Sequence, residues 1–294
     1  MTPCDFHFQR RAKLALLGMA CTVVLTAARL QAHAQTPAPF VDDVPFITSP
    51  DNVTLEMLTM ASVKRGDHVI DLGSGDGRIV ILAAKRFEAT GLGVEIAPRL
   101  VEASQANARQ AGVADKVVFK EQDLCKTDLA PATVVTMYLL PDVNLALRPA
   151  LLALKPGTRV VSHDWDMGDW QPDRTTVLPV PNKAVGLDKS STVHLWTVPA
   201  RVDGLWCAGG LLRGASIRLA QTYQNFTGTL GWRGRTRELT GLIKGAELHV
   251  PAGSSGELVL QAVGNTLRIT SAQGGLALAQ GQTFTRSAAA TCDL

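Results

Sequence analysis

The sequence HVIDLGSGDGR, residues 68–78, sets a short apolar run directly before three closely spaced glycines. The apolar run predicts a buried strand, and the glycines predict a tight turn that lets a ligand approach the backbone closely. Residues 76–87 continue with apolar side chains at helical spacing, so they predict a helix with one buried face. A strand, a glycine turn and a helix in this order form the repeating unit of α/β sheets.

The same rhythm of apolar runs and amphipathic stretches extends from residue 40 to residue 199. It predicts helices from Pro98 to Gly112 and over 143–154. The further strands that it predicts are 91–96, a strand from 117 onward, 134–140, 158–163 and 192–198. We therefore expect residues 40–199 to form an α/β domain with a parallel, Rossmann-like sheet.

The sequence beyond residue 201 has a different pattern. Short alternating segments are separated by glycine-rich turns at a spacing of about 8–12 residues, which is typical of antiparallel β structure. The predicted strands are 216–219, 226–230, 238–242, 247–250, 257–263 and 267–270. Residues 201–294 are therefore expected to form a small all-β domain, either an antiparallel barrel or a sandwich, with no chemistry of its own.

The first 34 residues follow the order of an export signal. Basic residues at 10–13 precede an apolar run over 14–28, and the sequence AHA at 32–34 offers a cleavage site. The apolar run is shorter than the roughly 20 residues of a permanent membrane span. We expect residues 1–34 to be a signal peptide, with Gln35 as the mature N-terminus and the periplasm as destination. An uncleaved anchor is the alternative, and the Arg10-Arg11 pair leaves a twin-arginine route open.

Three cysteines remain after removal of that signal, namely Cys125, Cys207 and Cys292. Their spacing matches no zinc pattern, and no metal site is expected. Cys207 and Cys292 lie near the two ends of the all-β region, which favours a disulfide between them in an oxidising compartment and leaves Cys125 as a thiol. Unpaired buried thiols are the alternative.

The formal net charge of +3 comes from the N-terminal segment. Residues 1–39 hold four basic and one acidic side chain, residues 40–200 hold 16 and 20, and residues 201–294 hold 9 and 5. The chain after residue 39 is therefore neutral as a whole, and its composition predicts no nucleic-acid partner.

The glycine turn favours a cationic ligand over a phosphate. Its spacing is G-x-G-x-G, whereas a dinucleotide site needs G-x-G-x-x-G to seat a pyrophosphate on the helix N-terminus. Asp71 ends the strand and Asp76 lies on the turn, and carboxylates there suit a ligand that carries an ammonium and a sulfonium group. Glu95 at the next strand end is placed to bind both ribose hydroxyls of an adenosyl group, with Ile96 against its adenine.

Residues 71–78 are close to the D/E-x-G-x-G-x-G motif of class I S-adenosylmethionine-dependent methyltransferases. Over residues 40–170 the chain resembles the mitochondrial protein-lysine methyltransferases that modify the ATP synthase c subunit and the ADP/ATP carrier, and similar exported bacterial proteins. Ala97 departs from the asparagine that is usual in that family. The resemblance implies a Rossmann-like methyltransferase domain, S-adenosyl-L-methionine as cofactor and a lysine amine as methyl acceptor. The segments that carry it are 46–50, 57–58, 66–67, 71–80, 95–98 and 123–124.

The cofactor residues expected on these grounds lie at three strand ends and in the segment before the first strand. They are Thr48, Asp71, Gly73, Ser74, Gly75, Gly77, Glu95, Ile96, Asp123 and Leu124. In the resembled family, the acid at the third strand end contacts the adenine amino group. Ligands of such folds bind at the carboxyl edge of the sheet, so these residues are expected to meet there.

The methyl acceptor is expected at the ends of the fourth and fifth strands, with Tyr138 and His163 as catalytic candidates. Tyr138 is placed to orient a nucleophile or to offer its ring to an amine, and a buried core tyrosine is the alternative. His163 opens the polar cluster 163–166, with Asp169 close by, and is placed to act as a general base. A cation site or a solvated acidic loop are the alternatives for this cluster.

Two functions fit these residues. The first is an exported S-adenosylmethionine-dependent methyltransferase that acts on a protein lysine or a small nucleophile. The second is an exported module that binds an adenosyl compound without turnover and uses its β domain to dock to an envelope partner. A working acceptor pocket around Tyr138 and His163 distinguishes the first from the second.

Overall fold

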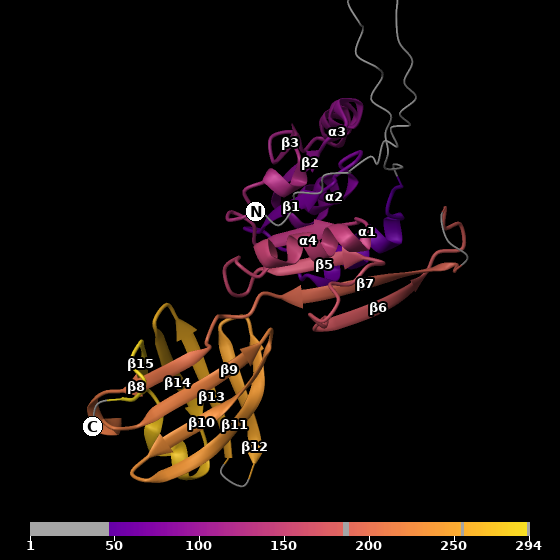
Figure 1. Ribbon diagram of the computed structural model, residues 1–294. Helices are drawn as coiled ribbons and strands as arrows, with labels where there is room; N and C mark the ends of the chain where they lie inside the picture. The colour runs from indigo at the N-terminus through magenta and orange to yellow at the C-terminus, as the bar shows by residue number, and fades with distance from the viewer. Residues whose placement is uncertain (1–46, 185–187, 254–255, 293–294) are drawn as a thin grey trace, which may run out of the picture.

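The computed structural model describes residues 47–184, 188–253 and 256–292, which form an α/β half and a β-barrel half (Figure 1). In Figure 1 the helices surround the sheet of the α/β half, and the barrel lies beyond the end of strand β7. The predicted signal peptide, residues 1–34, lies outside the described residues. None of the helices among the described residues combines the length and the apolar composition of a membrane span.

Seven strands form the sheet of the α/β half, in the order β3-β2-β1-β4-β5-β7-β6. Strands β1 to β5 pair in parallel, so their carboxyl ends share one edge of the sheet. The bounds are β1 His68–Leu72, β2 Thr90–Glu95, β3 Val117–Glu121, β4 Val134–Met137, β5 Arg159–His163, β6 Arg174–Pro179 and β7 Ser190–Thr197. This arrangement confirms the expected Rossmann-like fold.

The sheet is mixed, whereas the sequence pattern indicated parallel strands. β7 runs antiparallel to β5, and β6, which the sequence pattern did not indicate, pairs antiparallel with β7. β6 ends at Pro179 and β7 begins at Ser190, which leaves too few residues for the crossover that parallel pairing needs. β6 lies at the edge of the sheet with mostly exposed side chains, so it shows no apolar run in the sequence.

Helices cover both faces of this sheet. Helices α1, α2 and α3 pack on the face that carries Val69, and α4 packs on the opposite face, which carries Ile70. The helix α1 has no counterpart among the predicted helices. The bounds are α1 Asp51–Met60, α2 Arg78–Phe87, α3 Pro98–Ala111 and α4 Pro141–Leu151.

Eight antiparallel strands of the second half close into a barrel, which decides between the two expected all-β folds. Strands β8 and β15, which the sequence pattern did not indicate, close it by pairing with each other. Trp206, Phe226 and Phe284 are fully buried inside. The bounds are β8 Gly204–Ala208, β9 Ser216–Thr222, β10 Asn225–Trp232, β11 Arg235–Lys244, β12 Glu247–Gly253, β13 Gly256–Val263, β14 Thr266–Ala272 and β15 Thr283–Ser287.

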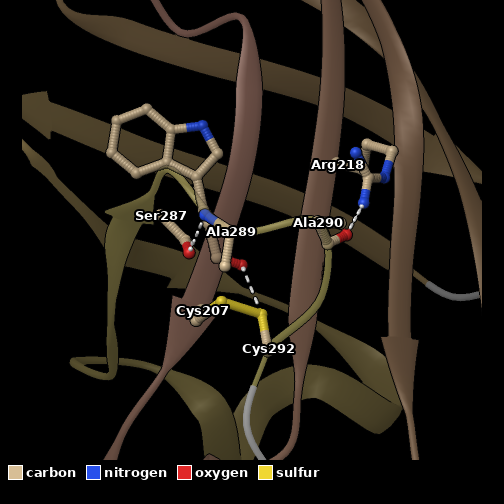
Figure 2. The surroundings of a disulfide bond; sticks show 7 residues. Cys207, Arg218, Ser287, Ala289, Ala290 and Cys292 are labelled. Carbon is tan, nitrogen blue, oxygen red and sulfur yellow. Dashed lines mark hydrogen bonds between the residues drawn. A yellow bond between two sulfur atoms is a disulfide. The ribbon is translucent and has the colours of Figure 1, made fainter.

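A disulfide joins the first strand of the barrel to the segment that follows its last strand, as predicted (Figure 2). It links Cys207 on β8 to Cys292 after β15, with their Cα atoms 5.5 Å apart. Arg218 on β9 donates a hydrogen bond to the carbonyl of Ala290 and ties the same C-terminal segment to a second strand. Cys125 in the α/β half remains a half-buried thiol.

The two halves meet through two turns of the barrel. At the β9–β10 turn, the amide of Gln224 donates to the carbonyl of Gln171 at 2.7 Å, and the hydroxyl of Tyr223 donates to Asp169 at 2.9 Å. At the β11–β12 turn, Gly245 accepts the N–H of Ala200 at 2.7 Å. The β11–β12 contact lies at the edge opposite to the ends of β1, β2 and β3, because Ala200 follows the end of β7 and β7 runs antiparallel to β5.

Candidate functional site

The glycine turn after β1 requires glycine for conformation and for packing. Gly73, Gly75 and Gly77 have φ values of 74°, 52° and 81°. A side chain on Gly73 would come within 2.9 Å of Leu139, and one on Gly77 within 2.6 Å of the Phe119 ring. The turn therefore leaves no room for a side chain at Gly73 or Gly77, and Gly73 is the one of its three glycines that is exposed.

Hydrogen bonds hold this turn against the end of β2. The N–H groups of Gly73 and Ser74 donate to the carbonyl of Val94 at 3.0 and 2.9 Å. The carboxylate of Glu95 then accepts the N–H of Gly75 at 3.0 Å with one oxygen. Its other oxygen accepts the N–H groups of the next two residues, 96 and 97, at 2.9 and 3.1 Å. Glu95 thus joins the turn to its own strand end, and its carboxylate is fixed in place for a ligand.

Asp71 is a buried acid at the end of β1. Its side chain accepts a hydrogen bond from Thr136 at 2.7 Å. Burial raises the pKa of Asp71 to about 7, and the nearby carboxylates of Glu95 and Asp76 act in the same direction. A cation bound at this edge would lower that pKa again, because it stabilises the ionised carboxyl.

Polar and apolar groups around the turn fit an adenosyl ligand. The hydroxyl of Ser74 is buried and has no hydrogen-bond partner in the described part of the chain. Ile96, directly after Glu95, is 57% exposed although its side chain is apolar. A buried hydroxyl that lacks a partner and an exposed apolar side chain are features that a bound ligand would satisfy.

The end of β3 lies next to this edge. The N–H of Gln122 donates to the carbonyl of Glu95 at 2.9 Å. Asp123 accepts the N–H of Cys125 at 2.9 Å and begins the short helix η1, Leu124–Lys126. Thr48 is half-buried in the segment before α1. A groove of about 500 Å³ lies on the helix side of the turn, but its lining reaches none of Asp71, Glu95 and Asp123.

Tyr138 and His163 come together at the ends of β4 and β5. Their rings stack with centroids 3.8 Å apart and an interplanar angle of 27°. The hydroxyl of Ser49 lies 2.8 Å from Nδ1 of His163, whereas Nε2 is buried without a hydrogen-bond partner among the described residues. Burial lowers the pKa of His163 to about 4, so the imidazole is neutral at pH 7. A histidine with this pKa is a weak general base, and its geometry supports a role in positioning Tyr138.

Asp164 is the centre of the polar cluster beside that pair. One carboxylate oxygen accepts the N–H of Thr192 at 2.9 Å, and the other lies 2.7 Å from Nζ of Lys183. This second oxygen is also 3.5 Å from the hydroxyl of Tyr138 and 3.6 Å from Nε2 of His163. Burial opposes ionisation, but the hydrogen bonds from Lys183 and Thr192 hold the pKa of Asp164 below its usual range. The cluster therefore contains an ionised carboxylate paired with a primary amine.

The rest of the predicted polar cluster lies elsewhere. Asp166 accepts the N–H of Gly168 at 3.0 Å, and Asp169 is engaged by Arg148 and Tyr223 at the contact between the halves. Over the described ranges, no group of three or more His, Cys, Asp or Glu side chains could hold a metal ion.

Sequence reasoning missed Ser49 and Lys183 as members of this site. Ser49 lies in the segment 46–50, which carries part of the family resemblance. Its neighbour Thr48 is an expected cofactor residue, and this closeness is the signal that could have identified Ser49. Lys183 follows β6, and without that strand no sequence pattern places it beside β5.

The α/β half is similar in sequence to known methyltransferases. Residues 71–174 match the family model of the ANTKMT methyltransferase domain, and this match lies wholly within the α/β half. A protein-lysine N-methyltransferase of Saccharolobus islandicus is 43% identical over 45% of this chain and 84% of its own length. The mouse lysine N-methyltransferase of the ATP synthase c subunit is 34% identical over 55% of this chain and 65% of its own length, just under two thirds. The crystal structure of an RNA methyltransferase from Salinibacter ruber in complex with S-adenosyl-L-homocysteine is 50% identical; the match spans 53% of this chain and 96% of that protein, with a TM-score of 0.48.

Proposed function

Because the chain belongs to the family of S-adenosylmethionine-dependent protein-lysine N-methyltransferases, we propose that it methylates the ε-amine of a lysine in a protein. The observation that carries this proposal is the grouping of Tyr138, His163 and Asp164 at the ends of β4 and β5. An aromatic face beside a carboxylate suits a cationic amine. This grouping shares the edge of the sheet with Asp71 and Glu95.

Two acidic side chains at the ends of β1 and β2 are placed to bind the cofactor. Asp71 and Glu95 would face its ammonium and ribose groups, and Ser74 offers a hydroxyl that lacks a partner among the described residues. When bound, S-adenosylmethionine supplies a methyl group whose bond to the sulfonium breaks as the amine lone pair forms the N–C bond, which leaves S-adenosylhomocysteine.

The residues of the acceptor side orient the amine and do not act as the base that takes up its proton. The incoming ammonium must lose one proton to solvent before its lone pair can react, since neither His163, with a pKa of about 4, nor Asp164, with a lowered pKa, retains a proton at neutral pH. Burial raises the pKa of Tyr138, so its hydroxyl stays protonated and orients toward Asp164. Methyl transfer depends mainly on alignment, which such fixed groups provide.

Labelled methyl transfer tests this proposal. The mature chain, residues 35–294, is incubated with S-adenosylmethionine that carries an isotopic methyl label and with two peptides that differ only by lysine or arginine at one position. We expect the label on the lysine nitrogen and about tenfold lower kcat/KM in Tyr138→Ala, about 1.4 kcal/mol of transition-state stabilisation. Label on another kind of atom would contradict lysine methylation. Cofactor binding with no transfer to any acceptor would favour the module that binds without turnover.

We also propose that the protein is exported to the periplasm. The basic start, the apolar run and the AHA sequence at 32–34 support export, and the disulfide between Cys207 and Cys292 suits an oxidising compartment. In that compartment the barrel would be the part that docks to an envelope partner. Fractionation with N-terminal sequencing decides this: Gln35 in the periplasmic fraction is expected, and a cytoplasmic chain that begins at Met1 would refute it.

A further inference from the structure

Lys183 brings a primary amine of the chain itself to the acceptor side of the site. Its Nζ lies 2.7 Å from a carboxylate oxygen of Asp164 and 2.7 Å from the carbonyl of Ser190. The side chains of Lys183 and Asp164 are each 15% exposed. The same carboxylate oxygen lies 3.5 Å from the hydroxyl of Tyr138 and 3.6 Å from Nε2 of His163. An ammonium on a four-carbon chain therefore already occupies the cluster expected to receive one.

The charges of this cluster balance with one cation. The carboxylate of Asp164 is ionised, while burial keeps His163 neutral and Tyr138 protonated. Loss of Lys183 would leave a nearly buried carboxylate without a counter-charge, which is unfavourable. The amine of a substrate lysine would restore the same ion pair with no net change in buried charge.

The ion pair is not needed to hold the backbone on either side of it. On the side of Lys183, its own N–H donates to the carbonyl of Val180 at 3.0 Å, and the N–H of Val180 donates to the carbonyl of Lys189 at 2.7 Å. On the side of Asp164, the other carboxylate oxygen accepts the N–H of Thr192. The contact between Nζ and Asp164 can therefore open without loss of these backbone bonds.

We propose that Lys183 is an internal stand-in for the acceptor lysine: its ammonium occupies, on Asp164, the position that a substrate amine takes. This proposal rests on lysine methylation as the function proposed above. It makes Asp164 the residue that binds the cationic amine of the acceptor. It also makes Lys183 a competitor that weakens acceptor binding while leaving the cofactor edge unchanged.

Binding of n-butylammonium, a mimic of the lysine side chain, tests the stand-in without turnover. The mature chain saturated with S-adenosylhomocysteine is titrated in three forms: wild type, Lys183→Ala and Lys189→Ala. Lys189 is exposed in the same segment and provides the matched loss of charge. We expect Lys183→Ala to bind n-butylammonium about tenfold more tightly than the other two forms, and n-butanol, which has no charge, to show no such gain. Adding Asp164→Asn to Lys183→Ala should abolish the gain.

Equal binding in all three forms would overturn the stand-in, as would a gain that survives Asp164→Asn. Should Lys183→Ala lose S-adenosylhomocysteine binding and so report a folding defect, Lys183→Ser serves in the same titration with the same expected gain.

The lysine peptide assay separates this inference from the proposed function. A lower KM for the peptide in Lys183→Ala, with unchanged affinity for the cofactor, supports both. A gain in amine binding with no methylation of any lysine peptide would refute the proposed function while the amine site stands. Lysine methylation with unchanged KM and no gain in amine binding would refute the stand-in alone.

Discussion

The α/β half buries polar side chains at the carboxyl edge of its sheet, whereas the barrel buries almost none. Asp71, Thr136 and His163 are each at most 2% exposed. In the described part of the barrel, Gln224 is the one buried polar residue, and its amide points to Gln171 of the other half. Burying polar groups reduces stability unless they are paired, and at this edge the hydroxyl of Ser74 and Nε2 of His163 are buried without a partner among the described residues, which indicates ligand chemistry there. The barrel, whose core is apolar, has no comparable group of buried polar side chains among its described residues.

The largest expected effect is a loss of stability in the barrel, with no change in cofactor affinity. Replacement of Cys207 and Cys292 by alanine opens a cross-link with a sequence separation of 85. The free energy of unfolding of the barrel should fall by about 4–5 kcal/mol, because the unfolded chain gains the entropy of that loop. Denaturant unfolding measures the loss, and calorimetry should show unchanged affinity for S-adenosylmethionine. Cys125→Ala is the control, and a loss of cofactor affinity in the double variant would contradict the division between the halves.

Glu95→Ala is expected to lower the affinity for the cofactor, the property that the loss of the disulfide leaves unchanged. Affinity for S-adenosylmethionine should fall by about 1–3 kcal/mol, because ligand hydroxyls and turn N–H groups lose their acceptor. Glu121 pairs with Glu95 across the strands and is exposed, so Glu121→Ala removes the same charge as a matched control. Calorimetric titration gives both affinities. Equal affinities in wild type and Glu95→Ala would remove Glu95 from the cofactor site.

Asp71 should make cofactor binding depend on pH. Its pKa is raised from 3.8 to about 7, chiefly by burial, so it is largely protonated below pH 7 and ionised above. A cationic ligand favours the ionised form. The affinity for S-adenosylmethionine should therefore rise by up to about 1.4 kcal/mol per pH unit as the pH increases toward 7, with release of a proton, and level off above.

Without ligand, the raised pKa of Asp71 makes the folded state less stable as the pH increases. The folded state keeps a proton that the unfolded state loses between pH 3.8 and about 7, so the contribution of Asp71 to the free energy of unfolding falls as the pH rises through that window. Calorimetric titration with S-adenosylmethionine in buffers of different ionisation enthalpy measures the proton that is released on binding, and denaturant unfolding at several pH values measures the change in stability. Asp71→Asn should abolish both dependences, and an unchanged pH profile in that variant would exclude Asp71 as their source.

The smallest expected effect loosens the contact between the halves. Gln224→Met keeps the volume of the side chain and removes its hydrogen bond to the carbonyl of Gln171. The loss should be about 0.5–1.5 kcal/mol in the cooperative unfolding of the two halves, with no change in cofactor affinity. Thermal unfolding followed in both halves measures it. A change in cofactor affinity beyond error would show that the barrel takes part in the ligand site.

The same contrast explains what the sequence could predict. β1, the glycine turn and α2 follow one another in the chain, so local pattern alone identifies them and the acids at their ends. β6, β8 and β15 are short or exposed, and they are stabilised by pairing with strands distant in sequence, which no local pattern reveals.

The acceptor side shows this limit at the level of single residues. Tyr138 and His163 were identified because each ends a strand that the sequence indicates. The ion pair between Asp164 and Lys183 depends on the β6–β7 hairpin, and the lowered pKa of His163 depends on burial beneath Ser49 and Tyr138, both non-local properties of the fold.

Hydrogen–deuterium exchange of residues 35–294 with and without S-adenosylmethionine tests most directly whether ligand chemistry is confined to the α/β half. Slower exchange is expected at residues 71–78, 95–97 and 121–125, with no change over 204–287 and no effect of NAD at equal concentration. Slower exchange in the barrel strands, equal protection by NAD, or no protection of the glycine turn would contradict the assignment of the cofactor to this edge of the sheet.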